Sequence, residues 1–478
     1  MDKKLCLLVG LFLLVTKVFA ITVHWDGEGG DGLWTTAINW SSNLVPNEDD
    51  DIVIDNSIVT SSYTIRLPDI AVTVRSLSML PDAAFSITLL LPSTNTITSA
   101  AFATTGSGYT IVIGSGATFI NNGLVSSGTN LVIGDSMQVR NGGRYVHRTR
   151  SGHSTWLSRL SKMPITANGT IEFDVPVSSY VISLSGRSYG NLVLSSQLHG
   201  VPVTYSGNGS QNVFIRGRLE LTAATTLTLS FSGGEFLVEN DLVIAPNSTF
   251  NVQASSNSNI VRLKGNINVA GTITETGTGN PQLILSGSSQ QSVRIQSLQG
   301  SVVLDVNNSN GISLSAPLLI SHILRLSSGK VKTTGTELLT IADNAVIEGA
   351  SFEKFVDGPL GKIGDEAFLF PVGKGLQFAS ASLSAGTDVA DEYICEYHQG
   401  NPMVIFGDSF ETPGLTHMSS LEWWTIERRS GNTARQVSLL VTTYSDATLL
   451  EHLRVLRFDG QEWKNEGNIS YSGLSFGT

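Results

Sequence analysis

The sequence contains the stretch Ile111-Val-Ile-Gly-Ser-Gly-Ala-Thr-Phe-Ile-Asn-Asn-Gly123, and a variant, Leu131-Val-Ile-Gly-Asp-Ser-Met-Gln-Val-Arg-Asn-Gly-Gly143, follows shortly after it. In both, three apolar residues precede a glycine turn, an alternating strand follows, and a turn of Asn and Gly ends the unit. Short strands and turns repeated at such spacing are typical of a β-solenoid, in which each coil depends on the coils stacked against it.

A second series of variants lies further along the chain, at nearly equal steps: Gly217-Arg-Leu-Glu-Leu221, Asn240-Asp-Leu-Val-Ile244 and Gly265-Asn-Ile-Asn-Val269. Alternation with a period of two places one set of side chains inside and the other in water. Equivalent residues of successive coils should therefore stack. We expect Ile113 to stack on Ile133, and Leu219, Leu242 and Ile267 to form one interior ladder.

The composition supports an all-β fold and excludes some classes of function. The chain of 478 residues has 48 Gly, 14 Pro, 41% hydrophobic and only 14% charged residues, which argues against general disorder. The formal net charge is -11. Because an acidic chain repels phosphate backbones, we do not expect nucleic acid as a partner.

The first twenty residues have the pattern of an export signal. Lys3 and Lys4 precede an apolar run over 5–15, and Ala20 supplies the small residue of a cleavage site. We therefore expect a protein that is secreted or held at the outer cell surface. No later segment has eighteen uninterrupted apolar residues, so no transmembrane segment is expected after the signal. Of the two cysteines, Cys6 lies in the signal, which leaves Cys395 without an intrachain disulfide partner.

Residues 21–56 form a distinct opening segment with three tryptophans, Trp25, Trp34 and Trp40. We favour a cap in which these rings cover the exposed first coil. Two alternatives remain open: the same rings could form a platform that stacks on sugars, or the nearby acids could bind Ca²⁺. The acidic candidates are Asp26, Glu28, Asp31, Asp49, Asp50 and Asp51.

Residues 144–159 are unusually basic and aromatic for this chain. We expect a loop or short helix that leaves the solenoid, and we name His147 and Trp156 as further candidate ligand-binding residues. Beyond a turn-rich break at 357–361, charge and aromatic content rise, with Trp423, Trp424 and Trp463 available for a compact core and a long strand over 436–443. The predicted organisation is a signal peptide (1–20), a cap (21–56), a parallel β-helix (57–365) and a β-sandwich-like domain (366–478).

Several of these motifs resemble the secreted β-helix surface proteins of Bacteroidota. The resemblance rests on the Trp/Gly/Asp opening, on Tyr189-Gly-Asn-Leu-Val-Leu194, and on Gly358-Pro-Leu-Gly361 and Phe370-Pro-Val-Gly-Lys-Gly375. It implies a right-handed β-helix followed by β-sandwich modules, and an adhesin-like role. A type IX sorting domain usually comes last in that family. No such domain is recognisable before Thr478, so we expect either a fragment of a longer protein or another export route.

The sequence offers little support for catalysis. A β-helix glycosidase would need paired carboxylates about one coil apart on one strand face. Glu220 and Asp241 are separated by about one coil, but both occupy the polar positions of alternating strands. We therefore expect a non-enzymatic, monomeric protein without a cofactor, Ca²⁺ being the one ion considered, with glycans or other cell-surface proteins as partners. The alternative is a carbohydrate-active β-helix enzyme, a lyase or glycoside hydrolase, or a glycan-binding module.

Overall fold

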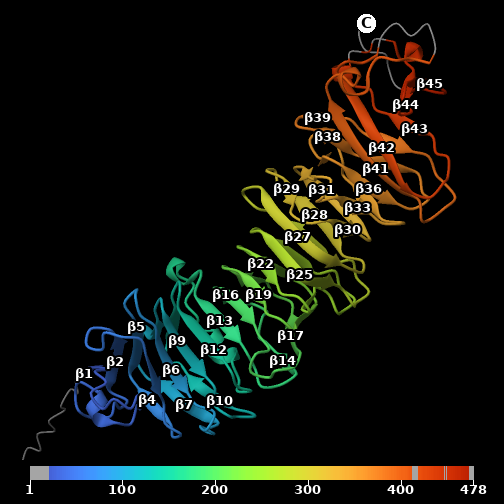
Figure 1. Ribbon diagram of the computed structural model, residues 1–478. Helices are drawn as coiled ribbons and strands as arrows, with labels where there is room; N and C mark the ends of the chain where they lie inside the picture. Colours follow the sequence, from blue (N-terminus) through green and yellow to red (C-terminus); the bar gives the residue numbers. More distant parts are fainter. Residues whose placement is uncertain (1–20, 412–417, 446, 448, 473–478) are drawn as a thin grey trace, which may run out of the picture. The chain divides into compact units, whose positions relative to one another are not determined.

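The computed structural model describes residues 21–411, 418–445, 447 and 449–472, so the predicted signal peptide over 1–20 lies outside the described residues. Strands account for 45% of the chain and helices for 5%. The chain divides into two compact units, Met1–Ser161 and Lys162–Thr478 (Figure 1). Both are built from stacked β-solenoid coils, followed in the second by a small antiparallel region, which confirms the predicted fold class. The predicted β-helix over 57–365 is divided between the units.

Unit 1 has three parallel sheets, one for each side of the coil. Its strands are, sheet by sheet, β1 (Ile21–His24), β2 (Asp50–Asp55), β5 (Ser76–Leu80), β8 (Tyr109–Ile113) and β11 (Ser136–Val139); β3 (Tyr63–Arg66), β6 (Ile87–Leu91), β9 (Ala117–Asn121) and β12 (Arg144–His147); and β4 (Val72–Val74), β7 (Ser99–Thr104) and β10 (Thr129–Val132). Two short helices accompany them, η1 (Ala37–Asn39) and α1 (Ser154–Leu157).

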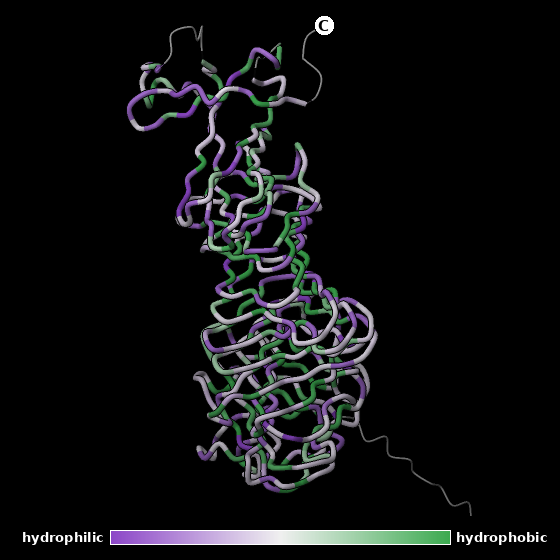
Figure 2. The backbone as a smooth tube through the Cα atoms, turned by 90° about the vertical axis from the view of Figure 1, so that its right-hand side faces the viewer, coloured by the Kyte–Doolittle hydropathy of each residue, from purple (hydrophilic) through white to green (hydrophobic). Residues whose placement is uncertain are grey.

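Unit 2 repeats this plan, and its stacked rungs can be followed in Figure 2. The first parallel ladder contains β13 (Thr170–Phe173), β16 (Asn191–Leu194), β19 (Leu219–Leu221), β22 (Leu242–Ile244), β25 (Ile267–Thr274), β27 (Gln291–Leu298), β29 (Ile312–Leu314), β32 (Val331–Lys332), β35 (Val356–Asp357) and β38 (Val372–Lys374). The second contains β14 (Ser179–Val181), β17 (Val203–Gly209), β20 (Thr225–Phe231) and β23 (Thr249–Asn251), and continues into β25 and β27.

The third side of unit 2 is an eight-stranded parallel sheet. It contains β15 (Ser188–Tyr189), β18 (Val213–Ile215), β21 (Glu235–Val238), β24 (Ile260–Leu263), β26 (Gln282–Leu285), β28 (Val303–Asn307), β31 (Ile323–Ser328) and β34 (Val346–Glu348). The short helices of this unit are η2 (Pro164–Thr166), α2 (Met403–Phe406), η3 (Thr443–Ser445) and η4 (Leu450–His452).

The core of the unit 2 solenoid is a continuous stack of aliphatic side chains. Leu219 lies opposite Leu242, and Leu242 lies opposite Ile267, which confirms the predicted interior ladder. The stack extends to Leu192 before it and to Val293 after it, and all five side chains are buried. Each coil thus shields the apolar residues of its neighbours, which explains how a chain with no disulfide between described residues sustains a narrow core.

The second predicted stack, Ile113 on Ile133, is wrong. Ile113 lies between Met79 and Val139 in the sheet that contains β5, β8 and β11. Ile133 follows β10, which belongs to another side of the coil and pairs with β7. The residue that stacks on Ile111 is Met137, not Leu131. The two motifs, which begin at Ile111 and Leu131, therefore lie on different sides of the coil.

The C-terminal part of unit 2 changes from parallel to antiparallel pairing. One sheet runs through β30 (Leu318–Ile320), β33 (Leu339–Ile341) and β36 (Leu360–Ile363) in parallel, then adds β41 (Glu392–Gln399) and β42 (Glu422–Ser430) in antiparallel (Figure 1). The other antiparallel strands are β39 (Gln377–Phe378), which pairs with β38, the sheet of β37 (Phe368–Phe370), β40 (Ala381–Leu383) and β43 (Val437–Leu439), and the pair β44 (Val455–Phe458) and β45 (Trp463–Gly467).

The predicted domain limits near residue 365 stay a prediction, although the change of pairing occurs nearby, at β36 and β38. The long strand predicted over 436–443 is shorter in the structure, where β43 covers only Val437–Leu439. Among the described residues, none of the helices has the length and apolar character needed to cross a lipid bilayer.

Candidate functional sites

The three N-terminal tryptophans form a buried cluster. Trp25, Trp34 and Trp40 are only 3%, 1% and 0% exposed. The ring of Trp40 packs edge-on against both others, with centroids 4.9 Å from Trp25 and 4.6 Å from Trp34, and its indole N–H donates to the Trp34 carbonyl at 2.8 Å. This packing fits the cap interpretation and leaves no free ring face for a sugar to stack on.

Asp31, one of the proposed Ca²⁺ ligands, holds the cap loop together. Its carboxylate accepts hydrogen bonds from the Thr36 hydroxyl at 2.6 Å, the Leu33 N–H at 2.9 Å and the Asn39 amide at 2.7 Å. These bonds, led by that from Thr36, lower the pKa of Asp31. The residue therefore acts as a turn anchor.

The other acids of the cap region are dispersed. Asp50 is buried and accepts both the N–H and the side-chain amide of Asn47 at 2.8 Å. Asp51 accepts the Ser76 hydroxyl, and Asp26 accepts the N–H of Glu28. Asp49 is exposed. Among the described residues, the one group of three acidic, His or Cys ligands close enough to share a metal lies in unit 2, so the predicted site at Asp26, Asp31, Asp49, Asp50 and Asp51 is not assembled.

Residues 144–159 do not leave the solenoid, contrary to our expectation. Arg144–His147 is the strand β12, which continues the ladder after β9, and only the following turn, Ser154–Leu157, is helical. His147 and Trp156 are buried, and the Trp156 ring packs 4.7 Å from that of Tyr145. Burial lowers the pKa of His147 to about 3, with a further contribution from His153. Both candidate ligand-binding residues are thus part of the core.

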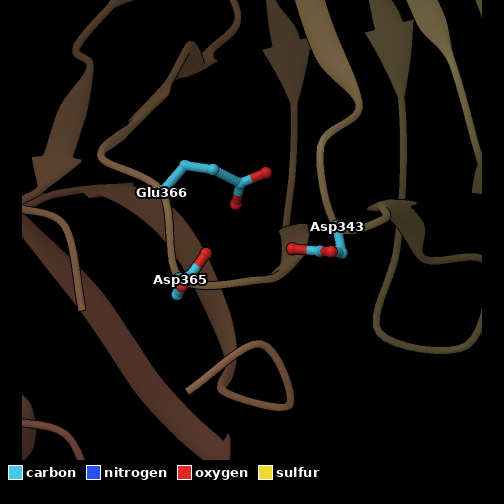
Figure 3. A group of neighbouring side chains, drawn as sticks. All are labelled: Asp343, Asp365 and Glu366. Atoms are coloured by element: carbon cyan, nitrogen blue, oxygen red, sulfur yellow. The ribbon is translucent and has the colours of Figure 1, made fainter. Parts of the chain in front are cut away.

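The acid cluster that the structure does assemble contains Asp343, Asp365 and Glu366 (Figure 3). Strands β33 and β36 stack in register, so the turns that follow them also lie side by side. Asp343 comes from the first turn, and Asp365 and Glu366 come from the second. Figure 3 shows the three side chains directed toward one another, and one oxygen from each lies within 4.8 Å of the others.

A buried lysine already neutralises part of this cluster. Lys362 is 4% exposed, its Nζ lies 3.0 Å from Glu366 Oε2, and it donates to the Ala342 carbonyl at 2.8 Å. Burial raises the pKa of Glu366, but hydrogen bonds from Lys362 and from backbone N–H groups outweigh it and hold the pKa below its usual value. Three carboxylates suit Ca²⁺ or Mg²⁺. Here the ammonium group of Lys362 already supplies a positive charge to the cluster, in place of the charge of a metal ion.

Sequence reasoning missed this cluster because it considered strand faces rather than turns. The signal was the spacing between Asp343 and Asp365, which is close to one coil. The pair that we did consider is not formed: Glu220 lies opposite Val243 and pairs with Arg218 at 2.6 Å, whereas Asp241 accepts the Asn266 N–H at 2.8 Å.

The outer face of unit 2 carries a column of hydroxyl groups. One residue from each coil occupies the same position, and no other residue type interrupts the series: Ser179, Thr204, Thr226, Thr249, Thr272 and Ser297. A parallel column two positions further along each strand is largely polar: Val181, Ser206, Thr228, Asn251 and Thr274. We call the first column the hydroxyl ladder.

A wide groove of about 2640 Å³ runs through the C-terminal part of unit 2. Its lining includes residues 418–429, which contain most of β42, residues 433–441, which contain β43, and residues 452–458 and 465–472. Trp424, Ile426 and Leu439 are half-buried along it. The acid cluster does not line this groove.

No protein-family model, curated protein or solved structure matches the chain. The class of protein is therefore defined by the fold itself, a β-solenoid with a C-terminal antiparallel region.

Proposed function

We propose that the chain is a non-catalytic, adhesin-like structural protein of the cell exterior, which uses its solenoid as a regular contact surface for glycans or other surface proteins. The N-terminal sequence, with two lysines before an apolar run and a small residue at position 20, supports export. The Bacteroidota-like motifs at 25–40, 358–361 and 370–375 support a surface role.

The hydroxyl ladder is the observation that carries this proposal. Strands of a sheet lie about 4.8 Å apart, so the ladder offers one hydroxyl donor and acceptor at each such step. The neighbouring column adds hydroxyl groups at Ser206, Thr228 and Thr274, whereas Asn251 is buried and donates to Thr276. A repeated array of this kind suits an extended polysaccharide better than it suits a small substrate, which requires a concave pocket.

A double variant tests the ladder directly. Thr226→Val and Thr249→Val remove two adjacent hydroxyls but keep the side-chain shape and the β-branched character of the strands. Residues 21–478 should bind at least one of a panel of insoluble cellulose, chitin and pectin in a pull-down assay, and the double variant should bind it roughly tenfold more weakly, as expected for the loss of a few hydrogen bonds.

The matched control is Thr88→Val with Thr118→Val in unit 1. Those residues also stack on an outer face, but the neighbouring column there is apolar, with Leu90 and Ile120. The control should bind as the unmodified protein does. No binding to any polysaccharide, or equal losses in the two double variants, would remove the ladder as the basis of the function.

The alternative function, glycoside hydrolysis, is favoured by one observation, the acid cluster. Retaining glycosidases hold two carboxyl groups about 5 Å apart, and Asp343 and Glu366 approach that distance. The ion pair with Lys362 and the position of the cluster outside the groove count against it. Release of reducing ends from the same polysaccharides that Asp343→Asn or Glu366→Gln abolishes would establish this alternative.

A further inference from the structure

Within the part of the chain that the structure describes, strand β42 is an open edge of its sheet. It is the terminal strand in the order β30-β33-β36-β41-β42, and it is nine residues long. The groove contacts every residue from 418 to 429, on both faces of the strand, and therefore runs along the edge itself. A strand that has no partner on one side among the described residues presents N–H and C=O groups that a further strand can pair with.

The pairing of β42 with β41 determines which backbone N–H and C=O groups of β42 point toward β41 and which point away from it. Gln399 lies opposite Glu422, and the N–H of Gly400 donates to the Leu421 carbonyl at 2.7 Å. In an antiparallel ladder, hydrogen-bonded pairs alternate along the strand. The backbone groups of Trp424, Ile426 and Arg428 therefore point away from β41, toward the open edge.

A second copy of β42 matches this edge when it pairs antiparallel about a two-fold axis. Such an axis places one residue opposite itself, and Ile426 is the midpoint of Glu422–Ser430. The whole strand then overlaps its copy. Trp424 faces Arg428 of the second copy, and Trp423 faces Arg429 of the second copy, so the register forms four cation–π pairs around an Ile–Ile contact.

Charge also favours this register. The strand holds Glu422, Glu427, Arg428 and Arg429, so it is neutral within a chain of net charge -11. Arg428 donates to the Thr433 carbonyl at 3.4 Å, and no carboxylate among the described residues lies within ion-pair distance of it. A shift of one register step would either place Glu427 opposite itself or place Trp423 opposite Glu427, and both shifts shorten the overlap.

We propose that the chain forms a two-fold dimer in which β42 pairs antiparallel with β42 of a second copy, with Ile426 on the axis. The two sheets then become one continuous sheet across the dimer. The sequence alone predicted a monomer, because the open edge is visible only once β41 and β42 are placed. The dimer is independent of the ligand of the hydroxyl ladder.

A complementary pair of variants tests the register. In Ile426→Lys, two ammonium groups face each other across the axis, and in Ile426→Glu two carboxylates do. Like charges directly opposite each other are destabilising, so each variant alone should dimerise at least about tenfold more weakly. An equimolar mixture should recover the dimer, because an ammonium group then faces a carboxylate across the axis. Sedimentation equilibrium of residues 21–478 over a concentration series measures all three samples.

The matched controls are Leu319→Lys and Leu319→Glu on β30, the strand at the other end of the same sheet; Leu319 is exposed and does not line the groove. Both should dimerise as the unmodified chain does. A monomeric unmodified chain at every concentration overturns the proposal. So does a dimer that either Ile426 variant leaves intact, or a mixture that stays monomeric. Recovery in the mixture also shows that both variants are folded, which separates a lost interface from a lost fold.

Discussion

The tryptophans at the N-terminal end of unit 1 are more deeply buried than those on β42 in the C-terminal part of unit 2. Trp25, Trp34 and Trp40 are buried in one cluster, under a loop held by Asp31. Trp423 and Trp424 are half-buried on an edge strand beside a wide groove. In the first region, aromatic rings cover the strands at the end of the solenoid. In the second, an edge strand remains able to pair with another strand.

The largest expected effect is on the cap. Trp34→Ala removes a fully buried ring from a close-packed cluster, which costs about 3–5 kcal/mol of unfolding free energy. Trp423→Ala removes a half-buried ring that stacks on His398, so the loss should be well below that of Trp34→Ala. Urea unfolding of both variants measures the contrast. Equal losses would mean that the two regions are packed alike.

A second prediction concerns acid sensitivity in the C-terminal part. Arg435 and Asp391 are both buried, with Nη2 and Oδ2 2.9 Å apart, and the same guanidinium donates to the carbonyls of Gly364, Asp365, Glu366 and Ser384. Burial raises the pKa of Asp391, but hydrogen bonds and the charge of Arg435 outweigh it and lower the pKa overall.

A lowered carboxyl pKa gives stability that is present above the unfolded-state pKa, about 4, and is lost as the pH falls through the folded-state value. The stability of the C-terminal part should therefore begin to fall below about pH 4 and fall further as the pH approaches the lowered pKa of Asp391. Asp391→Asn should be less stable at neutral pH and should lose this acid-dependent step. Limited proteolysis across a pH series reports this loss of stability, and a pH profile shared by the unmodified chain and Asp391→Asn would contradict the assignment.

The smallest effect should be seen at Cys395. This thiol is buried in β41, and burial raises its pKa, so the reactive thiolate is suppressed. A thiol reagent should not label the native protein. In increasing urea, labelling should begin before limited proteolysis first cuts within residues 21–56, because β41 lies beside the edge strand β42. Simultaneous onset would show that the two regions unfold together.

The interior ladder was predictable because its three members are preceded at similar steps by the turn residues Gly217, Asn240 and Gly265. Leu219, Leu242 and Ile267 occupy equivalent positions in coils of nearly constant length. The pair Ile113 and Ile133 failed because an apolar triplet before a glycine turn occurs on more than one side of a coil. The step from Ile111 to Leu131 is too short for a full coil, which extends from Ile111 to Met137.

The candidate sites were less predictable, since they depend on which turns and edges are neighbours. The sequence correctly marked the tryptophans at 25, 34 and 40 as a group, but it could not show that their ring faces are covered. The acids Asp343 and Asp365 become neighbours only through the register of β33 and β36. The open edge of β42 likewise depends on β41, which reverses the direction of the sheet.

The uniformity of the interior stack has a consequence for how such a chain can change in length. Leu192, Leu219, Leu242, Ile267 and Val293 are interchangeable aliphatic residues at equivalent positions. Deletion of one whole coil, residues 242–266, would bring Leu219 opposite Ile267 and restore the same contacts one step shorter. Duplication of that segment would add one step of about 4.8 Å. The length of the solenoid can therefore change by whole coils, through deletion or duplication, while the contacts of the core stay the same.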